Sequence, residues 1–210
     1  MNGHPDEETI AHARSELAAR DPVLARLDAK IAPFVWRSRA SGFAQLTAMI
    51  VEQQVSVASA RAIWARLEAG LGEVTPVAVL ARDADQLRGL GLSRQKARYL
   101  HAIAEAEIDF TALATLPEDE AVGVLTRITG VGRWTAEIYL MMSEGRPDAF
   151  PAGDLALQAA MLAAEGLTGA RPSERALRAR AEPWRPWRGV AAHLLWAFYL
   201  TLPRPKAGSA

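Results

Sequence analysis

The stretch LTRITGVGRWTAEIYL, residues 125–140, places two glycines between two segments that each have the hydrophobic pattern of a helix. Apolar residues recur on one side of the glycines at Ala121, Val124, Leu125 and Ile128, and on the other side at Trp134, Ile138, Met141 and Met142. This spacing of three and four residues is typical of an amphipathic helix. The sequence therefore predicts helices over residues 118–128 and 134–143, joined by a tight turn.

The first of these helices has a start signal in TLPE, residues 115–118. A threonine followed three residues later by glutamate is typical of a capping box, and proline is tolerated in a first helical turn. We therefore expect the Thr115 hydroxyl to cap the helix, with Glu118 reaching back to it.

Gly130 and Gly132 allow a tight reversal with positive φ, and they leave the amides from Gly130 to Trp134 uncovered by side chains. Successive uncovered amides beside a helix N-terminus form a site that suits an anion such as phosphate. The alternative is an ordinary corner between two helices that ends in a glycine cap. The turn alone does not decide between these interpretations.

Helical patterns extend through almost the whole chain, and the one strand-like segment, EVTPVAVL at residues 73–80, contains a proline. The sequence predicts an all-α fold. Helices are expected near residues 7–19, 22–31, 42–53, 56–69, 76–81, 83–89, 94–106, 118–128, 134–143, 154–164, 173–181 and 187–201. The segment LRGLGLSRQKARYL, residues 87–100, looks like a degraded second copy of the glycine turn, with weaker phosphate-binding ability.

Composition limits the possible functions. The 210 residues are 50% hydrophobic and carry 24 basic and 24 acidic side chains, so the chain can bury a core but lacks the large basic field of many nucleic-acid binders. It has no cysteine and four scattered histidines, which excludes disulfides, cysteine-held clusters and an obvious metal site. No signal peptide or membrane span is indicated, and we expect a cytoplasmic protein.

Asp154 stands at the end of a Pro/Gly-containing loop, in AFPAGDLALQ at residues 149–158, directly before an apolar helical run. Its side chain is placed to cap that helix, and this structural role alone would account for it. A carboxylate at a helix N-terminus is also a stabilised anion, which suits a group that faces developing positive charge.

The combination of TGVGRWTA with a Gly/Pro-rich loop ending in an aspartate resembles the helix-hairpin-helix, Gly/Pro-rich loop, aspartate superfamily of DNA glycosylases. Within it, the chain is most similar to the 3-methyladenine DNA glycosylase II family, in a compact form without the N-terminal α/β domain of some members. Residues 42–64, 87–100 and 182–199 also match that family, and the resemblance covers about residues 20–200. It implies two packed helical lobes with the active-site cleft between them. One lobe would span about residues 42–150 with the hairpin at 118–143, the other residues 1–41 and 151–203, with a frayed tail at 204–210.

The resemblance also implies roles for individual residues. Asp154 would be the catalytic carboxylate, and Gln53 and Gln54 would wedge into the gap left by an extruded nucleotide. The base pocket would be lined by Trp134, Trp196 and Tyr139, with Phe34 and Trp36 as further candidates; core packing is the alternative for these aromatic residues. The DNA backbone would be held at Gly130, Val131, Gly132, Arg133 and Thr135, and a monovalent cation by the main-chain carbonyls of Thr126, Ile128 and Val131.

Related glycosylase/lyases carry a lysine directly after the glycine turn, where this chain has Trp134, so the resemblance implies a monofunctional enzyme. It would need no cofactor and no iron–sulfur cluster. It would excise 3-methyladenine, 7-methylguanine and related purines from damaged double-stranded DNA by base flipping, as a monomer in the cytosol or nucleoid. Hairpin amides would make most phosphate contacts, helped by Arg94, Lys96, Arg133 and Arg188. The competing hypothesis is a non-catalytic helix-hairpin-helix module that only grips DNA.

Overall fold

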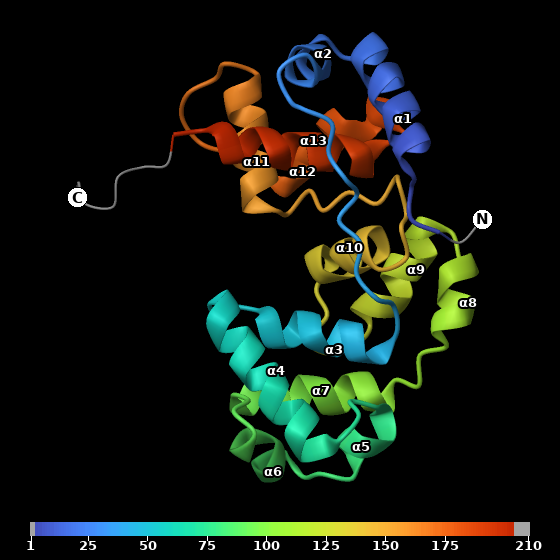
Figure 1. Ribbon diagram of the computed structural model, residues 1–210, viewed down its shortest axis with the longest axis vertical. Helices are drawn as coiled ribbons and strands as arrows, with labels where there is room; N and C mark the ends of the chain where they lie inside the picture. The colour runs from blue at the N-terminus through green and yellow to red at the C-terminus, as the bar shows by residue number, and fades with distance from the viewer. Residues whose placement is uncertain (1–2, 204–210) are drawn as a thin grey trace. The chain divides into compact units, whose positions relative to one another are not determined.

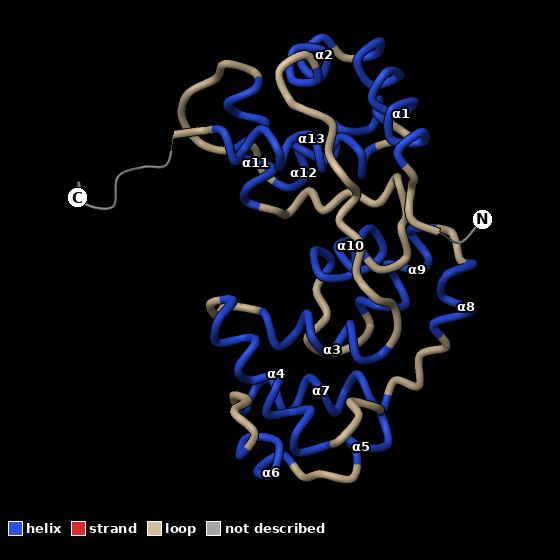
Figure 2. The backbone as a smooth tube through the Cα atoms, viewed as in Figure 1, coloured by secondary structure: helices blue, strands red, loops and turns tan. Residues whose placement is uncertain are grey.

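The computed structural model describes residues 3–203, and these residues form helices and connecting loops without a β-strand (Figures 1 and 2). The predicted all-α fold is confirmed. The predicted frayed tail at residues 204–210 lies outside the described residues. No helix in residues 3–203 is both long and apolar enough to cross a membrane.

One compact unit is formed by residues 38–144. Figure 1 shows α3 and α7 running side by side within it, and the α9–α10 hairpin follows later in the chain. Its helices are α3 (Phe43–Glu52), α4 (Val57–Leu71), α5 (Pro76–Leu80), α6 (Ala84–Gly89), α7 (Arg94–Glu105), α8 (Phe110–Thr115), α9 (Glu118–Thr126) and α10 (Arg133–Met142).

The second unit combines residues 3–37 with the C-terminal part of the chain from residue 145. The apolar helix α13 packs against α11, α1 and α2, so it forms the centre of this unit. The helices are α1 (Glu7–Arg20), α2 (Pro22–Asp28), α11 (Leu155–Ala164), α12 (Glu174–Ala181), a 3₁₀ turn η1 (Glu182–Trp184) and α13 (Arg188–Thr201).

Most helices begin at an aspartate or serine whose side chain accepts a hydrogen bond from an amide of the first turn. Asp6, Asp21, Ser56, Asp83, Ser93, Asp154 and Ser173 all act in this way. Such a cap satisfies amides that have no partner inside the helix. In the described part of the chain, helices α3, α9, α10 and α13 begin without such a side-chain cap, and the N-cap of α10 is Gly132.

Helix α9 begins at Glu118 as predicted, but the predicted cap by Thr115 is wrong. Pro117 is the N-cap and makes no side-chain bond, while Thr115 ends the short helix α8. The Thr115 hydroxyl instead donates to the carbonyl of Ala112 at 2.8 Å. Because α8 has only six residues, it shows too little periodicity to be expected from the pattern.

The core of the first unit is densest around α10, where every residue from 135 to 142 is buried. Tyr139 is fully buried there, and its hydroxyl oxygen accepts the amide hydrogen of Gly42, the N-cap of α3, at 2.7 Å. Burial raises the pKa of the Tyr139 phenol to about 12, against the opposing effect of this hydrogen bond. Tyr139 therefore fixes the start of α3 from inside the core.

Candidate functional site

The turn between α9 and α10 depends on Gly130. Its φ is +98°, a conformation that L side chains rarely adopt, and an added Cβ would collide with the aromatic ring of Tyr99 on α7. Gly130 is therefore required by both the backbone and the packing. Tyr99 braces the turn from the inside.

Gly132 has no comparable structural reason to be glycine. Its φ is −80°, which any residue adopts, and nothing lies within 4 Å of the position that a Cβ would occupy. The side of the hairpin at Gly132 is thus open and exposed. An open backbone beside an uncapped helix N-terminus is a surface on which an anion can approach closely.

One of the predicted amides is already engaged. The amide of Val131 donates to the carbonyl of Ile128 at 3.0 Å and closes the turn. The predicted anion site therefore narrows to the first residues of α10, where Gly132, Arg133 and Trp134 are all exposed.

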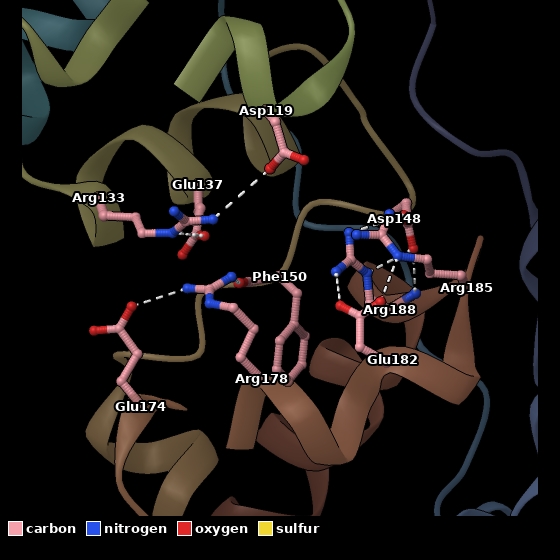
Figure 3. A network of polar contacts seen from close by, with 10 residues as sticks. All are labelled: Asp119, Arg133, Glu137, Asp148, Phe150, Glu174, Arg178, Glu182, Arg185 and Arg188. Carbon is pink, nitrogen blue, oxygen red and sulfur yellow. Dashed lines mark hydrogen bonds and ion pairs between the residues drawn. The ribbon is translucent and has the colours of Figure 1, made fainter. Parts of the chain in front are cut away.

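Trp134 has 42% of its side chain exposed, although it continues the apolar pattern of α10. The alternative that it is a core residue is therefore excluded. Neighbouring Arg133 donates from Nε to Glu137 at 2.9 Å, and its guanidinium lies 3.9 Å from Asp119 (Figure 3). Its side chain stays 45% exposed, so it can still face a phosphate.

Gln53 and Gln54 form the turn at the C-terminus of α3. Gln53 is half-buried, and its side-chain amide donates to the Thr135 hydroxyl at 3.3 Å, which ties this turn to the first turn of α10. Gln54 is exposed and has φ +56°, an unusual conformation for a residue other than glycine. Thr135 itself is buried, so it supports the turn and offers no exposed side chain for DNA.

In the second unit, Asp154 is the N-cap of α11, as predicted. Three donors converge on its Oδ1: the amides of Ala156 at 2.9 Å and Leu157 at 3.0 Å, and the indole N–H of Trp196 at 3.1 Å. The carboxylate is half-buried. These donors fix its rotamer and place a negative charge at the positive end of a helix.

Trp196 is held in turn by aromatic and cationic neighbours. The exposed fraction of Trp196 is 8%, and the Arg37 guanidinium lies 5.8 Å from the centre of its ring. The ring of His193 meets that of Trp196 edge to face, with 5.5 Å between the ring centres. His193 stacks on Trp36 at 4.2 Å and, more distantly, on Phe34. Trp196 therefore orients Asp154. The aromatic cluster of Trp36, His193 and Trp196 packs as part of the core.

The chain matches the HhH-GPD superfamily base excision DNA repair protein family over residues 47–186, a range that contains both the hairpin and Asp154. The chain belongs to this superfamily. The family membership predicted from the sequence is confirmed.

Three individual proteins illustrate this HhH-GPD relationship. The alkylbase DNA glycosidase-like protein mag2 of Schizosaccharomyces pombe is 31% identical over 127 residues, 58% of this chain and 59% of its own length. A crystal structure of the DNA-3-methyladenine glycosidase of Bacillus halodurans has a TM-score of 0.81 and 29% identity, with coverage of 90% of this chain and 89% of that chain. The S. pombe 3-methyladenine DNA glycosylase Mag1, solved in complex with abasic DNA, gives a TM-score of 0.72 and 28% identity, with 88% and 95% covered. The chain thus spans about three fifths of the length of mag2.

Three further residues that were predicted to line the base pocket or to contact DNA have other roles. Tyr139 is fully buried, so it offers no surface for stacking a base. The Lys96 ammonium donates to the main-chain carbonyls of Val51 at 2.8 Å and Gln53 at 2.7 Å, so it faces the end of α3 and not a phosphate. Arg188 is only 2% exposed and cannot reach DNA.

Arg188 is instead the buried centre of an ionic network whose other members are partly exposed (Figure 3). Its Nε and Nη2 donate to the two carboxylate oxygens of Asp148, each at 2.9 Å, and Nη1 donates to Glu182 at 3.1 Å. Arg185 also donates to Asp148, at 2.7 Å. Hydrogen bonding to Arg185 lowers the pKa of Glu182. The network ties the loop before Asp154 to the start of α13.

The second glycine turn, at residues 89–93, repeats the geometry of the first but differs in its surroundings. Gly91 has φ +102°, close to that of Gly130. The Arg66 guanidinium covers this turn and donates from Nε to the carbonyl of Leu90 at 3.0 Å, while Ser93 caps α7. Because Ser93 caps α7, the first-turn amides of α7 are less available to an anion than those of α10, which has no side-chain cap.

The sequence interpretation missed Tyr99 and His193. The contact of Tyr99 on α7 with Gly130 could not be expected from local spacing, because the two residues are 31 positions apart in sequence. His193 precedes Trp196 by three residues on α13, so their proximity could have been inferred from helical spacing. In residues 3–203, no group of three or more His, Asp or Glu side chains is placed to hold a metal ion.

Proposed function

We propose that this chain is a monofunctional DNA glycosylase that removes alkylated purines such as 3-methyladenine and 7-methylguanine from double-stranded DNA. The observation that carries the proposal is the Asp154 carboxylate, fixed by three donors at the N-terminus of α11 in an HhH-GPD chain. The names of the similar proteins, alkylbase and 3-methyladenine glycosylases, support the substrate class.

The chemistry needs little acid catalysis. An alkylated purine is cationic, so when its bond to C1′ breaks the electron pair leaves with the base, which becomes neutral. Positive charge then develops on the sugar, where the fixed Asp154 carboxylate stabilises it. Water adds through oxygen to C1′ and loses one proton, which Asp154 can accept and pass to solvent.

The exposed ring of Trp134 supplies the attraction for the flipped base. An electron-poor, cationic base stacks favourably on an indole. Trp196 contributes indirectly, since its N–H orients Asp154. The position directly after the turn holds this tryptophan and no lysine, so no Schiff-base nucleophile is present there, and we expect hydrolysis without strand cleavage.

DNA binding depends on the uncapped start of α10 and the open Gly132, assisted by Arg133 and Arg94. Because few cations take part, we expect a shallow dependence of affinity on salt, well below the slope of about ten in log–log terms of strongly basic binders. The main-chain carbonyls of Thr126, Ile128 and Val131, which lie in the last turn of α9 and in the turn that follows it, are proposed to hold a monovalent cation, since carbonyl oxygens are ligands of such ions. We place the enzyme, as a monomer, in the cytosol or nucleoid.

The test is excision from duplexes that contain 7-methylguanine, 3-methyladenine, hypoxanthine or ethenoadenine, followed by alkali to cleave abasic sites. We expect alkali-dependent cleavage with at least one alkylated purine. Failure on every duplex would overturn the proposal, and cleavage without alkali would overturn its monofunctional part.

The Asp154→Asn variant separates catalysis from DNA binding. Asparagine is also a good helix cap, so the fold should persist while excision falls by about 10³-fold or more and the Kd for DNA changes little. The matched control is Asp109→Asn, since Asp109 caps α8 through two amides in the same way. A variant at Asp154 that retained full activity would favour the non-catalytic DNA-binding module instead.

A further inference from the structure

The Lys96 ammonium occupies the C-terminal end of α3. Its Nζ donates to the carbonyls of Val51 and Gln53, at 2.8 and 2.7 Å. These carbonyls belong to the last turn of α3, where the helix leaves oxygens without an internal partner and carries a partial negative charge. A single cation therefore holds the residue on which the chain leaves the helix.

The turn that Lys96 holds is strained and exposed. Directly after Gln53, Gln54 adopts φ +56°, and such a left-handed conformation in a non-glycine residue persists only where the surroundings enforce it. Gln54, Val55 and Val57 are exposed, Val55 by 38% and Val57 by 69%. The strained turn and the first residue of α4 therefore expose one polar and two apolar side chains, Gln54, Val55 and Val57, which we call the tip.

Two independent contacts fix the base of this tip. Lys96 on α7 holds the main chain, and Thr135 on α10 accepts from the side chain of Gln53. Desolvation on burial lowers the pKa of Lys96, as expected for an ammonium directed into the protein. The other basic residues near the start of α7, Arg94 and Arg98, are exposed.

We infer that Lys96 is a positioning residue for base extrusion, which holds the Gln53–Ser56 turn in the conformation that fills the gap left by a flipped nucleotide. The inference rests on the proposed function. Because Lys96 acts through the turn, its loss should impair the extrusion of the base and leave both the Asp154 carboxylate and the hairpin grip intact.

The experiment compares Lys96→Met with the wild-type chain on a duplex in which a 2′-fluoro, cleavage-resistant lesion lies beside 2-aminopurine. Extrusion unstacks the 2-aminopurine and raises its fluorescence. We expect wild type and Asp154→Asn to give the full rise at saturating protein, and Lys96→Met to lose most of it while its Kd changes by less than about threefold. Single-turnover excision of the cleavable lesion should fall about 10- to 100-fold, since extrusion costs a few kcal/mol.

Two further variants make the result specific. Lys96→Arg retains a cation and hydrogen-bond donors and should recover part of the fluorescence rise. Arg98→Met removes a cation two residues away on the same helix and should leave the rise unchanged.

A full fluorescence rise for Lys96→Met at saturation would overturn the inference, whether or not its thermal stability falls. If instead the wild-type chain excised no lesion, the proposed function would fail, which the unmutated enzyme reveals before any variant is made.

Discussion

The indole N–H of Trp196 and the amides of Ala156 and Leu157 all donate to the same oxygen of Asp154, so Trp196 selects one rotamer of the carboxylate. The second unit contains a related arrangement, in which Trp184 donates at 2.8 Å to Oδ2 of Asp21, the N-cap of α2, while Oδ1 accepts the amides of the helix. Asp21 is 4% exposed and also binds Arg180. An aspartate N-cap that accepts from an indole N–H thus occurs twice, buried at Asp21 and half-buried at Asp154.

Replacing Trp196 by phenylalanine should slow catalysis more than it destabilises the protein. The ring packing is largely retained and only the N–H to Asp154 is lost, so we expect kcat to fall about tenfold with KM nearly unchanged. Trp184→Phe is the matched control, which should lower the free energy of unfolding by about 1–2 kcal/mol and leave kcat unaffected. Equal effects of the two substitutions on kcat would contradict the positioning role.

The two hairpin glycines should respond differently to alanine. Gly130→Ala places a methyl group in the Tyr99 ring and forces an unfavourable φ, so the free energy of unfolding should fall by about 2–3 kcal/mol. Gly132→Ala meets no protein atom and should change stability by less than about 0.5 kcal/mol. Urea unfolding measures both.

Gly132→Ala should also weaken DNA binding at least several-fold, because the added methyl group covers the open side of the turn. Fluorescence anisotropy measures the Kd. Unaltered affinity would show that phosphate does not approach there.

Gln54→Gly should stabilise the fold and slow excision. Glycine relieves the positive φ, which is expected to raise the free energy of unfolding by about 1 kcal/mol, while the side chain of the proposed wedge is lost. Glu107, which also has positive φ at +46°, provides the control: Glu107→Gly should stabilise the protein without slowing single-turnover excision. Full activity of Gln54→Gly would remove Gln54 from the wedge.

Acid should destabilise the second unit through His193. Burial, against the opposing hydrogen bond to Gly189, lowers its pKa from 6.5 to about 4, so the unfolded chain binds the proton more readily. Stability from this group is complete above pH 6.5 and declines as the pH falls to about 4, by roughly 3 kcal/mol in all. His193→Gln should flatten this decline in urea unfolding at pH 7, 5.5 and 4.5, and an unchanged slope would assign the acid sensitivity to other groups.

Arg188 and Arg94 should separate stability from DNA binding. Arg188→Met removes a buried guanidinium and leaves the half-buried Asp148 with less compensation, so we expect a loss of about 3 kcal/mol in the free energy of unfolding and the same salt dependence of DNA binding. Arg94→Met at an exposed site should preserve stability and reduce the log–log salt slope by about 1. A reduced log–log salt slope for Arg188→Met would show that Arg188 does contact a phosphate.

Local sequence signals predicted most of the helices, the hairpin and the cap at Asp154, because caps, glycine turns and helical periodicity depend on residues a few positions apart. Short α8 and the cap of α9 were local errors, and the other errors involve long-range partners. Lys96 was grouped with neighbouring arginines as a phosphate ligand, but its partners are the carbonyls of Val51 and Gln53, some 40 positions earlier. Charge predicts that a side chain is polar and leaves open whether it faces solvent or the end of another helix.

Aromatic residues were the hardest to place for a similar reason. The apolar pattern puts Trp134 and Tyr139 on the same helix α10, yet one is 42% exposed and the other fully buried. Only the packing of α10 against the rest of its unit determines which side is covered. The periodicity of a helix buried on nearly all sides carries little information about its single exposed face.

Helix α7 braces both turns assigned to DNA, since Lys96 holds the Gln53 turn and Tyr99 supports Gly130. The two residues are three positions apart, which corresponds to about 4.5 Å along a helix axis. The spacing between the proposed wedge and the proposed backbone grip is therefore set by the rise per residue of one helix. Inserting a residue between Lys96 and Tyr99 would put the two turns out of register, so that an enzyme with every functional side chain present could no longer grip the strand and fill the gap at the same nucleotide.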